Sequence, residues 1–190
     1  MRALQYVLLA IACLVYGGFT VGYLGFFRRP HGLPREMKIV ALVTGAVTWL
    51  QLALIAGRSA RWPNFILALI LYLAAAGLYG WAVRTTRRRR LSVAFSADQP
   101  EFLLAEGPYR MIRHPFYSSY LLYWIAGTIA AREPWLVVTI VLAGGSFLWA
   151  ALREEQKFAA SPLAAAYRSY RARTGMFVPK LFVPKLFGPR

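Results

Sequence analysis

The sequence predicts an all-α, polytopic membrane protein with five transmembrane helices. The chain of 190 residues is 58% hydrophobic and has a mean hydropathy of +0.46, whereas soluble domains are usually about 45–50% apolar. Its 23 Lys and Arg residues and 7 Asp and Glu residues stand in clusters. Between the clusters lie uncharged runs close to the ~20 residues that a helix needs to cross a bilayer.

Five uncharged runs give the expected spans in chain order. The first covers residues 3–27, and we expect it to be retained, because it is long for a signal peptide and lacks a good cleavage site. The next two cover residues 39–57 and 63–83. The last two cover residues 115–131 and 134–152, and the connection between them is so short that they must run antiparallel.

The cations lie mostly on one side of this expected topology. If the loops alternate sides, 19 of the 23 Lys and Arg residues fall in the 28–38 loop, in the 84–114 segment or from residue 153 onward. The positive-inside rule then places the N-terminus outside and the C-terminus in the cytoplasm, in the inner (cytoplasmic) membrane. This topology accounts for the net charge of +16 without a nucleic-acid partner.

The chain divides into three regions by composition. Residues 1–83 hold the three N-terminal spans, and residues 181–190 form a basic tail that continues a repeated Phe-Val-Pro-Lys-Leu motif. Residues 84–180 begin with a cytoplasmic loop, which we expect to be ordered because it is rich in apolar and aromatic side chains. The helical hairpin and an interfacial amphipathic helix follow. The expected apolar side of that helix consists of Phe158, Leu163, Tyr167 and Tyr170. Its arginines, which are expected to be free for lipid headgroups, are Arg168, Arg171 and Arg173.

Two polar features in or beside the spans each have two interpretations. Thr44, Thr48 and Gln51 share one face of the second expected span, where such side chains more often hold helices together than bind a ligand. The run from Arg87 to Arg90 follows the third span. It is either a stop-transfer anchor or a binding site for anionic lipid headgroups.

Two polar clusters stand at the ends of the expected hairpin. The first cluster consists of Gly107-Pro108-Tyr109-Arg110 and Arg113-His114-Pro115-Phe116-Tyr117, and the second is Glu154-Glu155. Because the two helices of the hairpin run antiparallel, both clusters are expected at the same membrane face and opposite each other. Structural explanations also apply, since proline suits the first turn of a helix, long cationic side chains reach the interface, and acids at a helix end are often solvated.

This combination of motifs resembles the isoprenylcysteine carboxyl methyltransferases, and phospholipid methyltransferases share the arrangement. The likeness rests on both clusters and on a trailing pattern from Tyr167 to Pro179, and it covers about half of the chain, residues 90–180. It implies an S-adenosyl-L-methionine-dependent methyltransferase whose site lies at the cytoplasmic membrane face and contains no metal. The cofactor-binding residues that it implies are Gly107, Pro108, Tyr109, Arg113, His114, Pro115, Tyr117, Glu154 and Glu155.

The resemblance also implies that Arg113, His114 and Glu155 are catalytic. In chemical terms, an acid of the pair would accept a hydrogen bond from the cofactor's amino group or ribose. Arg113 or His114 would hold its carboxylate, and a tyrosine would face its sulfonium cation. His114 or Glu155 would act as a base if the methyl acceptor were an amine or a thiol.

The methyl acceptor and two other functions stay open on the sequence. The expected partners are membrane lipids and a lipophilic small-molecule acceptor, which is an isoprenylcysteine-like carboxylate, a phospholipid amine or a small thiol. One alternative is a membrane reductase with a nicotinamide cofactor, although no Gly-x-Gly-x-x-Gly fingerprint follows a strand. The other is a non-catalytic membrane scaffold that binds anionic lipid.

Overall fold

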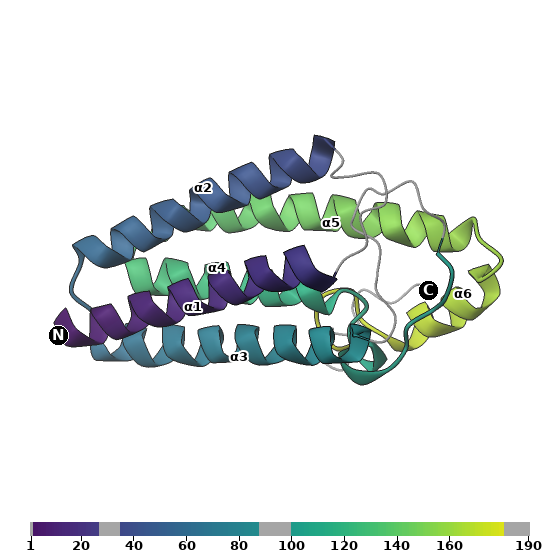
Figure 1. Ribbon diagram of the computed structural model, residues 1–190, viewed down its shortest axis with the longest axis horizontal. Helices are drawn as coiled ribbons and strands as arrows, with labels where there is room; N and C mark the ends of the chain where they lie inside the picture. The colour runs from purple at the N-terminus through teal and green to yellow at the C-terminus, as the bar shows by residue number, and fades with distance from the viewer. Residues whose placement is uncertain (1, 27–34, 88–99, 181–190) are drawn as a thin grey trace.

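The computed structural model describes residues 2–26, 35–87 and 100–180, and within them it is helical with no named strand. Five long helices run side by side along the molecule, and a short sixth helix lies at one end (Figure 1). The long helices are α1 (Arg2–Phe26), α2 (Arg35–Gly57), α3 (Trp62–Thr86), α4 (Pro115–Ala131) and α5 (Val137–Ala159). The short elements are the 3-10 turns η1 (Gly107–Arg110) and η2 (Pro134–Leu136), and helix α6 (Ala164–Arg173).

Four helical segments of the described chain are long and apolar enough to cross a membrane. They are Arg2–Gly25, Arg35–Gly57, Trp62–Thr86 and Pro134–Ala159. The expectation of an all-helical membrane protein is therefore confirmed, but the count of five spans is not. The missing span is α4, whose 17 residues would cover only about 25 Å at ~1.5 Å per residue.

Helix α4 lies in the interior of the bundle. Ten of its 17 residues are buried, including Ser119 and Tyr123, and it packs most extensively on α3 and further on α2 and α5. The Tyr123 ring lies 5.2 Å from the ring of Tyr72 in α3, and both side chains are almost fully buried. Because the other helices cover α4, it resembles the core helix of a soluble protein in its environment, and its length is less constrained by the bilayer.

Polar side chains join α2 to α4 inside the bundle. The Gln51 amide donates hydrogen bonds to the Trp124 carbonyl (3.1 Å) and to the Thr128 hydroxyl (3.3 Å), and the Trp124 indole donates to the Thr48 hydroxyl (3.2 Å). Thr44 does not take part, because its hydroxyl donates to the Ala41 carbonyl of its own helix. Thr48 and Gln51 therefore hold helices together, as the sequence favoured.

The C-terminal region contains the expected amphipathic helix with shifted bounds. In α6, Tyr167 and Tyr170 are buried, whereas Arg168, Arg171 and Arg173 are exposed. Phe158 belongs to the end of α5 instead, where its ring stacks on that of Tyr167 at 4.7 Å. Several sequence features lie outside the described residues: Arg28, Arg29, residues 88–99 of the 84–114 loop with Arg88–Arg90, and the tail from residue 181.

Candidate functional site

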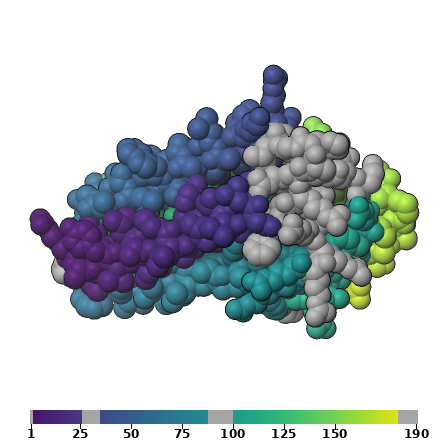
Figure 2. Space-filling view, viewed as in Figure 1, coloured from purple at the N-terminus to yellow at the C-terminus, as the bar shows by residue number. Residues whose placement is uncertain are grey.

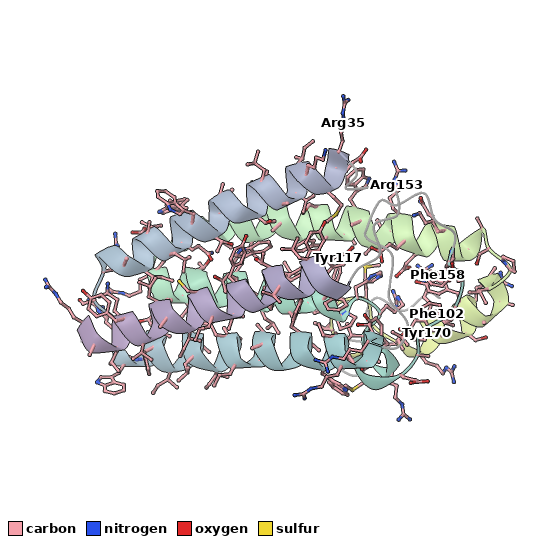
Figure 3. All side chains as sticks on the ribbon, viewed as in Figure 1. Arg35, Phe102, Tyr117, Arg153, Phe158 and Tyr170 are labelled. Atoms are coloured by element: carbon pink, nitrogen blue, oxygen red, sulfur yellow. The ribbon has the colours of Figure 1, made fainter. Side chains whose placement is uncertain are left out.

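The two polar clusters of the hairpin meet at the α6 end of the bundle. The segment from η1 to the start of α4 carries Arg113, His114 and Tyr117, and the end of α5 carries Glu154 and Glu155. Tyr117, Phe158 and Tyr170 all lie toward this end (Figure 3). We refer to Arg113, His114, Tyr117, Glu154 and Glu155 as the polar site.

A buried ion pair forms the centre of the polar site. The Arg113 Nε donates to Glu155 Oε1 at 2.7 Å, and the two side chains are only 8% and 6% exposed. The Arg113 Nη1 also donates to the Thr174 carbonyl. A carboxylate taken out of water needs such a partner, because an unpaired buried charge is strongly destabilising.

His114 lies between the two acids. Its Nδ1 is 3.6 Å from Glu154 Oε2, and its Nε2 is 3.5 Å from Glu155 Oε1. Burial lowers the pKa of His114, but the two carboxylates raise it by more, so the net pKa lies above its usual value of 6.5. The imidazole therefore tends to carry a positive charge between two negative charges.

Aromatic rings form a stack beside this charged centre. Tyr117 donates to Glu154 Oε1 at 2.5 Å, and its ring is stacked between His114 (5.5 Å) and Phe147 (5.0 Å). Trp124 continues the stack on the far side of Phe147, at 5.6 Å. Nothing in the sequence motifs pointed to Phe147, since it is one apolar residue among many in α5.

The other expected cofactor-binding residues shape the loop before α4. Gly107 has a φ of +55°, and a Cβ there would fall 2.2 Å from the Thr85 hydroxyl, so glycine is required for both reasons. Pro108 and Pro115 are buried, and Pro115 occupies the first turn of α4. Tyr109 is buried with its hydroxyl inside the protein, and burial followed by the charges of Glu154 and Tyr170 raises its pKa.

A short segment of the trailing Tyr167–Pro179 pattern holds this loop in place, through a pairing that the sequence did not reveal. Thr174, Gly175 and Met176, which we call the strap, run parallel to residues 112–114 and form one β-bridge. The Arg113 amide donates to the Gly175 carbonyl at 2.8 Å, and the His114 amide donates to the Met176 carbonyl at 3.1 Å. The strap thus fixes the backbone of the two residues whose side chains bind the acids.

Arg171 of α6 reaches the polar site from the surface. Its Nε is 3.5 Å from Glu155 Oε2, and its side chain is 60% exposed. At this distance the contact is a charge interaction and not a good hydrogen bond. Glu155 consequently faces three cationic side chains: the buried Arg113, His114 and the exposed Arg171.

Three buried polar atoms in or next to the polar site have no hydrogen-bond partner: the Tyr109 hydroxyl, His114 Nε2 and Glu155 Oε2. Such atoms are rare in folded proteins, and together they offer a hydroxyl, a ring nitrogen and a carboxylate oxygen to a small polar ligand. The described residues contain no group of three or more His, Cys, Asp or Glu placed to hold a metal ion. Binding of S-adenosyl-L-methionine here stays a prediction.

The fold and the site define an all-helical membrane protein with a buried, ion-paired polar site at one end of its bundle. No protein-family model matches the chain. The chain is similar to the cobalt-zinc-cadmium resistance protein CzcN of Cupriavidus metallidurans, with 35% identity over 138 residues. The matched region is 71% of this chain and 61% of that protein, so the chain spans less than two thirds of its relative's length.

This likeness contradicts the functional assignment made from the motifs. The relative is a metal-resistance protein, so the assignment to the isoprenylcysteine carboxyl methyltransferases is wrong by this comparison, and so is methylation of a lipophilic acceptor. Neither the nicotinamide-dependent reductase nor the lipid-binding scaffold gains support from it. The physical reason lies in the motif itself. Arg113, His114 and the two acids are held together by charge in an ion-pair cluster, and such a cluster does not specify one reaction.

Proposed function

We propose that this protein is an integral membrane component of resistance to cobalt, zinc and cadmium cations, and that it works through the polar site without coordinating the cation there. The observation that carries this proposal is the 35% identity to a cobalt-zinc-cadmium resistance protein. Four apolar helices long enough to cross a bilayer support a membrane location. The geometry of the polar site supports the proposal that no metal cation is coordinated there.

The charges of the polar site disfavour a divalent cation. Glu155 already binds the Arg113 guanidinium at 2.7 Å, and His114 adds a second positive charge within 3.5 Å. A metal ion at Glu155 would lie beside the Arg113 guanidinium, which stays charged at any physiological pH and would repel it. It would then lie next to a histidine whose raised pKa favours the protonated form, which is not a metal ligand. The site is therefore better suited to a small polar ligand with charges of both signs.

We propose further that α4 is a fifth, internal span, so that the N-terminus is outside and the C-terminus is cytoplasmic. The α2–α3 and α4–α5 connections lie at the same end of the bundle, because Arg58 pairs with Glu133 and Arg132 donates to the Ser59 carbonyl. The polar site lies at the opposite end, with most of the cations. The positive-inside rule supports the cytoplasm as the side of the polar site.

Growth under metal stress tests the proposed function. The full chain is expressed in a bacterium that lacks its own efflux of these cations, and the growth limit is measured in graded cobalt, zinc and cadmium. We expect the chain to raise the limit at least about twofold, either alone or together with a co-expressed efflux pump. Arg113→Ala is expected to lose this gain, whereas Arg110→Ala, an exposed arginine three residues earlier, is expected to keep it.

Two results would contradict the proposal, provided immunoblots show equal amounts of protein in the membrane. If the wild-type chain leaves the growth limit unchanged in both settings, the role in resistance is wrong. If equilibrium dialysis of the purified protein finds zinc bound with micromolar affinity, and Glu155→Gln abolishes that binding, the role without coordination is wrong.

A further inference from the structure

A groove of about 270 Å³ lies between α1 and α3, and no residue of the polar site lines it. The two helices lie side by side on the face shown in Figure 2. Small residues open the groove, since a Cβ added at Gly18 or Gly80 would meet nothing within 4 Å. The buried rings of Phe19 and Tyr79 line it.

The lining of the groove is apolar, although it contains a tyrosine. The Tyr79 hydroxyl donates to the Phe19 carbonyl at 2.9 Å, so this polar group is satisfied within the protein. Both helices are membrane-spanning by length and composition, and the groove is open on its outer side. An apolar groove that opens outward between two spanning helices faces acyl chains and not water.

A cation lies just beyond the groove on the same face of α3. Arg84 follows Gly80 by four residues, which is about one helical turn, and it precedes the end of the spanning segment at Thr86. Arg84 is exposed, and no ion pair or hydrogen bond engages its side chain within the part of the chain that the structure describes. The apolar groove matches the acyl chain of a phospholipid, and the free cation at its membrane-surface end matches an anionic headgroup.

We propose that this groove binds one acyl chain of an anionic phospholipid, and that Arg84 binds the phosphate of the same lipid. A helix from a second copy of the chain fits less well. A helix with its side chains is about 10–12 Å across and would fill far more space than the groove's 270 Å³, whereas a single acyl chain is thin enough to enter it. The proposal does not depend on the role in metal resistance, because none of the polar-site residues takes part.

Native mass spectrometry of the full-length protein tests the proposal. The protein is delipidated in detergent, titrated with phosphatidylglycerol or phosphatidylcholine, and examined for retained lipid. We expect one phosphatidylglycerol per chain, retained at least about fivefold better than phosphatidylcholine. Gly18→Leu fills the groove and is expected to lose this lipid, whereas Gly17→Leu adds the same bulk in open space outside the groove and is expected to keep it.

The headgroup part of the proposal has its own pair of variants. Arg84→Gln is expected to remove the preference for phosphatidylglycerol, whereas Arg168→Gln, which removes an exposed arginine on α6, is expected to leave it unchanged. Equal retention in Gly18→Leu and Gly17→Leu would overturn the groove as the acyl-chain site. A dimer that Gly18→Leu dissociates, with no retained lipid in the wild type, would overturn the lipid in favour of a second copy. Size-exclusion chromatography confirms that each variant is folded.

Discussion

Glu155 is the most constrained single residue of the polar site. It lies near the end of α5 and is almost completely buried. Its Oε1 accepts a hydrogen bond from the Arg113 Nε at 2.7 Å. Arginine suits this position better than lysine, because the same guanidinium also donates to the Thr174 carbonyl. The ion pair therefore joins three segments of the chain: the start of α4, the end of α5 and the strap.

Removing one partner of this pair should cost more than removing both. Arg113→Ala leaves Glu155 buried without its main partner, and we expect it to lower the free energy of unfolding by about 3 kcal/mol. The double variant Arg113→Ala with Glu155→Leu removes the stranded charge, so it should regain at least about 1 kcal/mol of this loss. Thermal or denaturant unfolding of the purified protein in detergent measures both values. Additive losses in the double variant would show that the pair is not coupled.

The charge of His114 should make stability depend on pH. Its pKa in the folded protein is raised above the unfolded value of 6.5. The stabilisation is therefore fully present below about pH 6.5, and it is lost as the pH rises through the folded pKa. We expect the melting temperature of the wild type to exceed that of His114→Gln by more at pH 5.5 than at pH 9. A difference that is constant between these two pH values would show that His114 does not titrate in this range.

At the scale of elements, the strap depends on Gly175. A Cβ at this position would fall 1.7 Å from the Val178 carbonyl oxygen, and the obstacle is backbone that cannot easily move away. Gly175→Ala should therefore detach the strap from residues 112–114 and expose it to protease. We expect limited proteolysis to cleave the variant between residues 174 and 180 at least about tenfold faster than the wild type.

Gly145→Ala is the matched control for the strap variant. It makes the same change in α5, where a Cβ would meet nothing within 4 Å, and alanine is the better helix former. This control should be cleaved at the wild-type rate. An unchanged cleavage rate in Gly175→Ala as well would mean that the strap does not need a glycine.

The sequence predicted the helices better than it predicted their environment. Prolines at the start of α3, α4 and η2 and the uncharged runs located most boundaries within a few residues. The interior position of α4 could not be predicted, because a helix that faces lipid and a helix that faces other spans are both apolar all round. Of the polar site, residue types and antiparallel pairing pointed to Arg113 and the acids. The strap residues belong to the trailing pattern from Tyr167 to Pro179, but their pairing with residues 112–114 left no signal, since one β-bridge between distant segments has no sequence period.

At the scale of the whole molecule, the two ends of the bundle differ in charge. The end with the polar site carries exposed cations such as Arg153, Arg168 and Arg173, whereas at the other end Arg58 is paired with Glu133. The Arg153 guanidinium lies 5.5 Å from the Trp149 ring, which is an arrangement typical of a membrane boundary. This asymmetry gives the proposed orientation a direct test.

Cysteine labelling in intact cells tests the orientation. In a Cys13→Ala background, Ser59→Cys places an exposed thiol in the α2–α3 connection, and Ser169→Cys places one on α6. A membrane-impermeant maleimide should label Ser59→Cys in intact cells, whereas Ser169→Cys should be labelled only after lysis. The reverse pattern would show that the polar site faces outward, and labelling of both only after lysis would show that both ends are cytoplasmic.

The strap has a consequence for the order of events during biosynthesis. The ribosome makes Arg113 well before Thr174, because the two residues lie far apart in the sequence. Until the chain has been extended past Met176, the Arg113 and His114 amides have no strap carbonyls to bind, and the Arg113 guanidinium lacks one of its two acceptors. The polar site of a nascent chain is therefore incomplete until the strap has been synthesised.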